Sequence, residues 1–254
     1  MSEAQHLQRS VREFVTACRS HRGNVRKLNE DAVLANGDAD LWVVADGMGG
    51  HMAGDHASRA IVTALSDLRF TDAVTLADRL DELEDILIGI HDTLQRYGRE
   101  QFGGATVGST VAAMLVHEGH ALAVWAGDSR LYRLRDGRLE QVTRDHNPVS
   151  DLLDVGEVTE AEALTADTNV ITRAVGGHGP LHLDLVLLDV QSGDDFLLCT
   201  DGLYRELSHN ELESILGARA GDDVERVADR LLDRCLQGVA QDNVSLIVTH
   251  VREG

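Results

Sequence analysis

The sequence predicts an α+β fold in which antiparallel sheets are covered by pairs of helices. Strand-like apolar segments come in pairs joined by short glycine-containing turns, which is typical of β-hairpins and therefore of antiparallel sheet. Helix-like segments, in which apolar residues recur every three or four positions, also come in pairs. Strands and helices do not alternate one by one, as they do in doubly wound parallel folds.

The strand-like segments are expected to form hairpins followed by one last strand. The pairs are 32–35 with 41–45, 110–116 with 121–126, 131–134 with 139–142, and 183–190 with 196–199. Asp136-Gly137 in the third turn is the strongest hairpin signal, and Ser192-Gly193 joins the fourth pair. The last strand is expected over 244–251.

The helix-like segments cover 57–68 and 76–94 in one pair, and 212–216 and 224–232 in the other. Ser208 is expected to cap the first helix of the second pair. Only two prolines and no Ser/Gly-rich spacer interrupt the 254 residues. We therefore expect a single domain over 1–254.

Charge and composition exclude several classes of partner. The 23 basic residues against 43 acidic ones give a net charge of −20, which would repel nucleic acid. No segment approaches the ~20 apolar residues of a membrane span, and residues 1–10 lack the apolar stretch of a secretory signal. The three cysteines have no Cys-x-x-Cys spacing, which favours a reducing compartment. We expect a cytoplasmic protein with no nucleic-acid or membrane partner.

Four aspartates mark the ends of apolar strand-like segments. Asp46, Asp128 and Asp201 follow such segments, and Asp242 precedes one. Because neighbouring antiparallel strands start and end at the same edge, all four are expected to converge on one rim. Carboxylates at the edge of an apolar layer are costly unless a cation meets them, and an all-oxygen ligand set favours Mg²⁺ or Mn²⁺ over Zn²⁺. The pattern indicates a site for divalent cations.

A simpler interpretation applies to each aspartate taken alone. An aspartate after a strand is most often a solvated turn residue, and Asp136, in the Asp-Gly turn between two arginines, needs no other explanation. Asp46 and Asp201 differ because they follow near-continuous apolar segments.

The polar segment 22–31 precedes the first of these strands. It is either a solvated loop or part of the same site, in which Glu30 and Asp31 orient metal-bound water and Arg26 offers its planar guanidinium to a phosphoryl group. The glycine-rich segments match neither a dinucleotide-binding fingerprint nor a P-loop, and no Gly-x-Ser-x-Gly elbow is present.

Eight short motifs follow one another along the chain at 22–31, 44–51, 108–110, 126–130, 143–146, 172–176, 198–203 and 241–245. In this order they resemble the metal-dependent protein phosphatases, the type 2C serine/threonine phosphatase family, in its bacterial form. The resemblance implies a four-layer sandwich, with two antiparallel sheets between pairs of helices and a binuclear metal centre at one end. The implied cofactors are two to three divalent cations, Mn²⁺ or Mg²⁺.

The resemblance also assigns roles to individual residues. It implies that Asp46 bridges two cations, that the Gly47 carbonyl binds one of them, and that Asp201 and Asp242 complete the ligands of the other. Glu30 and Asp31 would hold coordinated waters, and Arg26 would bind phosphate. Asp128, with help from Asn169, would bind a third cation. Residues 145–168 correspond to a mobile flap beside the site.

The implied reaction is the hydrolysis of phosphoserine and phosphothreonine by a hydroxide that bridges the two cations. The implied partners are phosphorylated proteins and a bacterial serine/threonine kinase that the phosphatase opposes. Many eukaryotic members carry a histidine as general acid directly after the Asp-Gly pair, where this chain has Met48; His51 and metal-bound water are the alternatives. Two other functions remain open: an inert phosphatase-like binding domain, and a two-metal hydrolase of another phosphoester.

Overall fold

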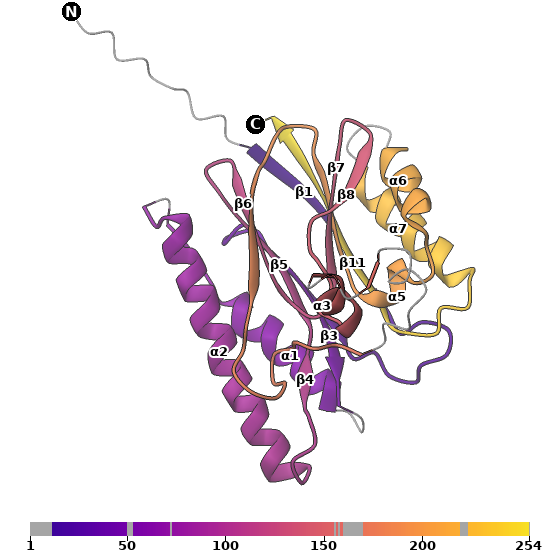
Figure 1. Ribbon diagram of the computed structural model, residues 1–254. Helices are drawn as coiled ribbons and strands as arrows, with labels where there is room; N and C mark the ends of the chain where they lie inside the picture. Colours follow the sequence, from indigo (N-terminus) through magenta and orange to yellow (C-terminus); the bar gives the residue numbers. More distant parts are fainter. Residues whose placement is uncertain are drawn as a thin grey trace, which may run out of the picture.

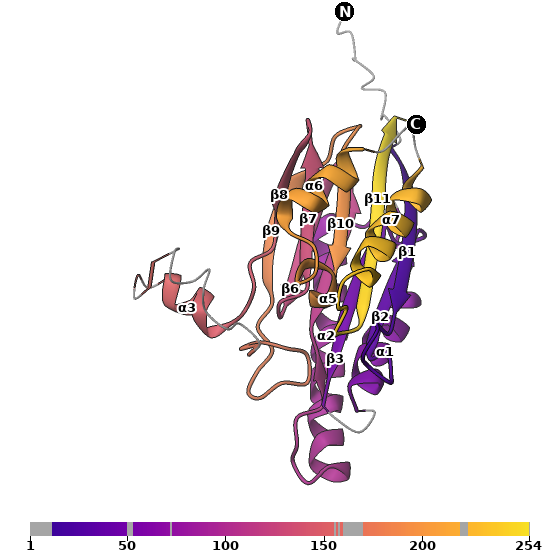
Figure 2. The ribbon, with the colours of Figure 1, turned by 90° about the vertical axis from the view of Figure 1, so that its right-hand side faces the viewer.

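A computed structural model describes residues 12–49, 53–71, 73–154, 156, 158–159, 170–218 and 223–253. Its centre is two stacked sheets in which the neighbouring strands are antiparallel (Figures 1 and 2). The five-stranded sheet has the order β1-β11-β10-β7-β8. Its strands are β1 (Arg12–His21), β11 (Val244–Glu253), β10 (Asp195–Cys199), β7 (Arg130–Arg135) and β8 (Arg138–Gln141).

The second, six-stranded sheet has the order β2-β3-β5-β6-β9, with a short β4 paired to β3. Its strands are β2 (Asp31–Asn36), β3 (Leu41–Met48), β4 (Gly108–Ser109), β5 (Val111–His117), β6 (His120–Ala126) and β9 (Asp184–Asp189). Strands β3, β5 and β6 are buried over almost their whole length, which explains why their sequences read as near-continuous apolar runs.

Pairs of helices complete the four layers, as the resemblance implies. The helices α1 (Ala53–Ser66) and α2 (Leu76–Gln101) cover the six-stranded sheet, and α6 (His209–Gly217) and α7 (Val224–Leu236) cover the other (Figure 1). Ser208 caps α6 in a capping box with Glu211, as expected, and Thr75 caps α2 in the same way. Within the described ranges, none of the helices is both long and apolar enough to cross a membrane.

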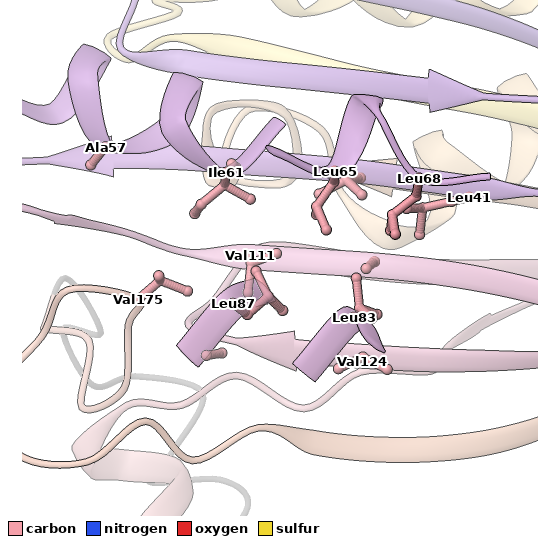
Figure 3. Close-up of a cluster of buried hydrophobic side chains, with 14 of the residues drawn as sticks. Leu41, Ala57, Ile61, Leu65, Leu68, Leu83, Leu87, Val111, Val124 and Val175 are labelled. Carbon is pink, nitrogen blue, oxygen red and sulfur yellow. The ribbon is translucent and has the colours of Figure 1, made fainter. Parts of the chain in front are cut away.

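Apolar side chains fill each of the three spaces between the four layers. Under α1 and α2, Ile61, Leu83 and Leu87 pack on Val111 and Val124 of the sheet (Figure 3). Each fully buried side chain of this kind contributes about 1.5–3 kcal/mol relative to its exposed state. A second cluster lies under α6 and α7, and a third, containing Trp42, Met114 and Phe196, lies between the sheets.

Three of the predicted hairpins are confirmed, and the fourth is wrong. The turn residues Asp136 and Gly137 both have positive φ, at 52° and 77°, as an Asp-Gly hairpin turn requires. The segments joined by Ser192-Gly193 lie in different sheets, because β9 pairs with β6 whereas β10 pairs with β7 and β11. Asp194 holds this crossing through hydrogen bonds of 2.6 Å from Arg135 to each of its carboxylate oxygens.

Candidate metal centre

The β2–β3 ladder brings two carboxylates face to face, because Asp31 is the register partner of Asp46. Asp31 opens β2 and is only 6% exposed, so it is not part of a solvated loop. Its Oδ2 accepts a hydrogen bond of 2.9 Å from the hydroxyl of Thr200, the residue that follows β10 in the other sheet. Burial, reinforced by the charges of Asp201 and Asp242, raises the pKa of Asp31 to about 7.

Asp46 is held by its backbone within β3. The strand continues to Met48, so the expectation that Asp46 ends it is wrong by two residues. The Asp46 N–H donates to the Thr110 hydroxyl at 3.0 Å, and the Thr110 N–H donates to the Asp46 carbonyl at 2.9 Å. Because both of its backbone groups are engaged, Asp46 has a fixed place at the rim.

The predicted convergence of the aspartates is visible in the electrostatics of Asp46. Burial and four neighbouring carboxylates raise its pKa well above the ordinary value; the neighbours are Asp31, Asp201, Asp128 and Asp242. Asp128 lies between β6 and β7, where the chain passes from one sheet to the other, and Asp201 begins the short helix α5 (Asp201–Tyr204). The rim is therefore the place where both sheets end.

Asp242 lies at the open side of the rim and pairs with Arg26. The Arg26 Nη2 donates to Asp242 Oδ2 at 2.6 Å, and the Arg26 side chain is still 52% exposed. This contact joins two segments that are 216 residues apart in sequence. The pair places a guanidinium at the mouth of the carboxylate cluster.

Asn243, which the sequence analysis does not single out, organises the segment 22–31. Its Nδ2 donates to the carbonyls of Arg22 and Leu28 at 3.0 and 2.8 Å, and its Oδ1 accepts from the Glu30 N–H at 2.8 Å. One buried side chain thus shapes the loop that carries both Arg26 and Glu30. Its only sequence signal is its place beside Asp242.

Gly47 lies where β3 meets the first turn of α1. Its N–H donates to the Glu30 carbonyl at 3.1 Å, and the Ser58 hydroxyl donates to the same carbonyl at 2.6 Å. A Cβ at Gly47 would lie 2.1 Å from the Gly54 carbonyl oxygen, so only glycine fits. The half-buried Glu30 and the Gly47 carbonyl are therefore fixed beside Asp46 by backbone contacts.

The carboxylates are close together but are not gathered around one point. Over the part of the chain that the structure describes, no three His, Cys, Asp or Glu side chains form a ready-made metal cluster. Arginines pair with three of the carboxylates: Arg26 with Asp242 at 2.6 Å, and Arg205 with Asp201 at 3.0 Å and Asp128 at 3.5 Å. The Oδ1 atoms of Asp31 and Asp201 are buried and receive no hydrogen bond from any residue that the structure describes. A concentration of acidic oxygens, two of them unsatisfied, fits a hard divalent cation.

Several predicted residues lie at the border of the described structure. Met48, at the position after the Asp-Gly pair, is half-buried and its thioether has no proton to donate. His51 and Asn169 lie outside the described residues. Of the expected flap, residues 145–154, 156, 158 and 159 are described, and they include α3 (Pro148–Asp154), which stands away from the sheets (Figure 2).

Comparison with known proteins assigns the family. The family model for protein phosphatase 2C matches residues 19–243. The chain belongs to the protein phosphatase 2C family. The serine/threonine protein phosphatase PstP of Mycobacterium tuberculosis is 37% identical over 92% of this chain, but the chain spans only 44% of that relative. The serine/threonine phosphatase stp of Listeria monocytogenes is 31% identical over 91% of this chain and 93% of its own length.

Solved structures of the family share the whole architecture. PppA, described as a key regulatory component of T6SS in Pseudomonas aeruginosa, superposes with a TM-score of 0.85 at 38% identity, over 94% of this chain and 97% of its own. The catalytic domain of PstP in complex with two manganese ions superposes with a TM-score of 0.82 at 35% identity, over 95% and 99% of the two chains.

Proposed function

We propose that this chain is a metal-dependent protein phosphatase that hydrolyses phosphoserine and phosphothreonine monoesters. The observation that carries the proposal is a cluster of acidic side chains at one rim, beside the exposed Arg26 guanidinium. In this cluster Asp31 is the register partner of Asp46, and one arginine contacts both Asp128 and Asp201. Membership of the protein phosphatase 2C family and the two manganese ions in the related PstP domain support it. The chain is similar in sequence to serine/threonine phosphatases over 91–92% of its length, which supports phosphoserine and phosphothreonine as the substrate class.

The donor set at the rim suits Mn²⁺ or Mg²⁺. Asp46 would bridge two cations, the Gly47 carbonyl would complete one, and Asp201 and Asp242 the other. Asp128 would serve a third cation. When bound, the cations activate water as a nucleophile at neutral pH and neutralise the charge of the phosphoryl group.

The residues around these ligands have positioning tasks. Glu30 and Asp31 would orient the ordered waters of the site, since one is fixed by its backbone hydrogen bonds and the other by Thr200. Arg26 would exchange its contact with Asp242 for two phosphoryl oxygens, for which its planar fork is suited. Because phosphoryl transfer depends mainly on charge stabilisation and positioning, Arg26 is the principal protein group for substrate.

The biological role that follows is signalling by reversible phosphorylation. The substrates would be phosphorylated proteins in the cytoplasm, and the chain would oppose a serine/threonine kinase. An inert binding domain should lack one or more of Asp46, Asp201 and Asp242, and all three are present. That argument places hydrolysis ahead of binding alone.

The test compares substrate classes on the same enzyme. Phosphate release with Mn²⁺ would be measured on a phosphothreonine peptide, a phosphoserine peptide, a nucleotide and a cyclic dinucleotide, with Asp46→Asn as the inactive control. The proposal expects release from the phosphopeptides that the variant loses. Faster turnover of the nucleotide or the cyclic dinucleotide would favour a hydrolase of another phosphoester, and no release from any compound would favour the binding domain.

A further inference from the structure

Arg205 joins two carboxylates of the rim that come from different connections of the chain: Asp128 from the link between β6 and β7, and Asp201 from the start of α5 after β10. It directly follows the short helix α5, one helical turn after Asp201, so its side chain returns over the carboxylate that begins that helix. Arg205 Nε lies 3.0 Å from Asp201 Oδ2, and Nη2 lies 3.5 Å from Asp128 Oδ2. One guanidinium therefore spans both acids.

The surroundings of Asp128 make this contact a built feature rather than a loose surface pair. The Tyr204 hydroxyl donates to the Asp128 carbonyl at 2.9 Å. The guanidinium of Arg130 stacks 3.6 Å from the Tyr204 ring centroid and forms a two-pronged contact with Asp145 at 2.8 and 2.7 Å. The residue that precedes Arg205 thus fixes the backbone of Asp128.

The burial of the two acids shows what the arginine does. Asp128 and Asp201 are only 6% and 8% exposed. A buried, ionised carboxylate is costly unless a cation meets it, and the Arg205 guanidinium lies 3.5 Å from one carboxylate and 3.0 Å from the other. Arg205 therefore supplies positive charge to both acids, as a bound cation would.

We propose that Arg205 is a built-in cation that occupies the place of a third divalent cation between Asp128 and Asp201. The inference rests on the proposed function, because it concerns how many cations the same rim accepts. A third cation must displace the guanidinium before it can use Asp128. The centre of this chain therefore takes up two cations readily and a third only weakly.

The experiment counts bound Mn²⁺ rather than activity. Mn²⁺ binding to the full chain would be measured by electron paramagnetic resonance of the free ion and by calorimetry, for wild type and for Arg205→Ala. The variant is expected to bind an additional Mn²⁺ per chain, with an affinity at least about tenfold higher than any third site of the wild type. Adding Asp128→Asn to the variant should remove that extra site.

Two further variants keep the result decisive. Arg226→Ala breaks a remote arginine–aspartate pair of 2.7 Å on α7 and should leave Mn²⁺ binding unchanged. Arg205→Gln is neutral but can still donate hydrogen bonds, and it replaces Arg205→Ala if the alanine variant does not fold. It should likewise bind an additional Mn²⁺ per chain.

The possible results separate this inference from the proposed function. If wild type and folded Arg205 variants bind the same number of Mn²⁺ ions with the same affinities, the inference is wrong while the two-cation centre stands. If wild-type protein binds no Mn²⁺, the proposed function fails and the inference fails with it.

Discussion

Asp31 and Asp46 occupy directly opposed positions on β2 and β3, at the end of the sheet where the rim begins. Like charges opposite each other in a ladder destabilise a sheet, and burial adds a desolvation cost. In the metal-free protein this cost is lowered when carboxyls of the rim take up protons, as the raised pKa values of Asp31 and Asp46 indicate. The most acidic part of the fold is thus stabilised either by protons or by cations.

The first prediction concerns the stability of the metal-free protein. The pKa of Asp31 is about 7 and that of Asp128 about 6, both above the unfolded value. The folded state therefore binds more protons than the unfolded state. In chelator, the unfolding temperature should rise by a few degrees as the pH is lowered from about 8 to about 5. Thermal unfolding across this range measures it.

Two comparisons check the cause of that pH dependence. Asp31→Asn should flatten it, because one of the titrating groups is gone. Saturating Mn²⁺ should stabilise the wild type most at the alkaline end, by about 2.7 kcal/mol at a hundred times the dissociation constant. A metal-free protein with the same unfolding temperature at both ends would contradict the prediction.

The second prediction concerns Arg26. Arg26→Ala should lower kcat/KM for a phosphopeptide by roughly tenfold to a hundredfold, since charge-assisted hydrogen bonds contribute about 1.5–3 kcal/mol. Mn²⁺ affinity should not fall, because Asp242 is released from its 2.6 Å contact. Lys27→Ala removes the same charge from a neighbouring exposed residue and should have little effect. Equal kinetics for the two variants would show that Arg26 does not bind substrate.

The third prediction concerns Gly47. Gly47→Ala would place a Cβ 2.1 Å from the Gly54 carbonyl oxygen, so the contact between β3 and α1 must open. We expect the free energy of unfolding to fall by about 1–3 kcal/mol and Mn²⁺ binding to weaken. Gly89→Ala is the matched control, because nothing lies within 4 Å of a Cβ there and alanine favours the helix by about 0.5–1 kcal/mol. Denaturant unfolding of both variants decides, and an unaffected Gly47→Ala would refute the close contact.

The fourth prediction follows from the net charge of −20. At low salt, basic phosphopeptides should have a higher kcat/KM than acidic ones, because long-range attraction favours their encounter with the site. The preference should fade as the ionic strength approaches about 1 M, where the Debye length is only about 3 Å. Kinetics with a matched pair of peptides at both salt levels test this, and equal preference at both would remove the electrostatic explanation.

The sequence predicts those parts of the fold and site that depend on local patterns. Near-continuous apolar runs locate the buried strands, and their ends place Asp46, Asp128 and Asp201 at the rim. The helix cap at Ser208 is predicted from a local pattern in the same way. The candidate carboxylates can therefore be recognised in the sequence because the strands before them are buried and have near-continuous apolar sequences.

The features that the sequence does not predict depend on contacts between distant segments. Ser192-Gly193 has the same turn signal whether the chain turns within one sheet or passes to the other, so the predicted pairing of β9 with β10 is wrong. The role of Arg205 depends on the fold, which brings Asp128 of the β6–β7 connection close to Asp201 at the start of α5. Asn243 likewise acts through carbonyls of a loop that is more than 200 residues away.

The most direct test of the central claim is a Mn²⁺ titration of phosphate release from a phosphothreonine peptide, with bound Mn²⁺ counted in the same samples for wild type and Asp201→Asn. The account predicts that release rises with Mn²⁺ occupancy, stops in chelator, returns when Mn²⁺ is restored, and falls at least about a hundredfold in the variant. Release that continues in chelator, or a wild-type protein that binds Mn²⁺ and releases no phosphate, would contradict it.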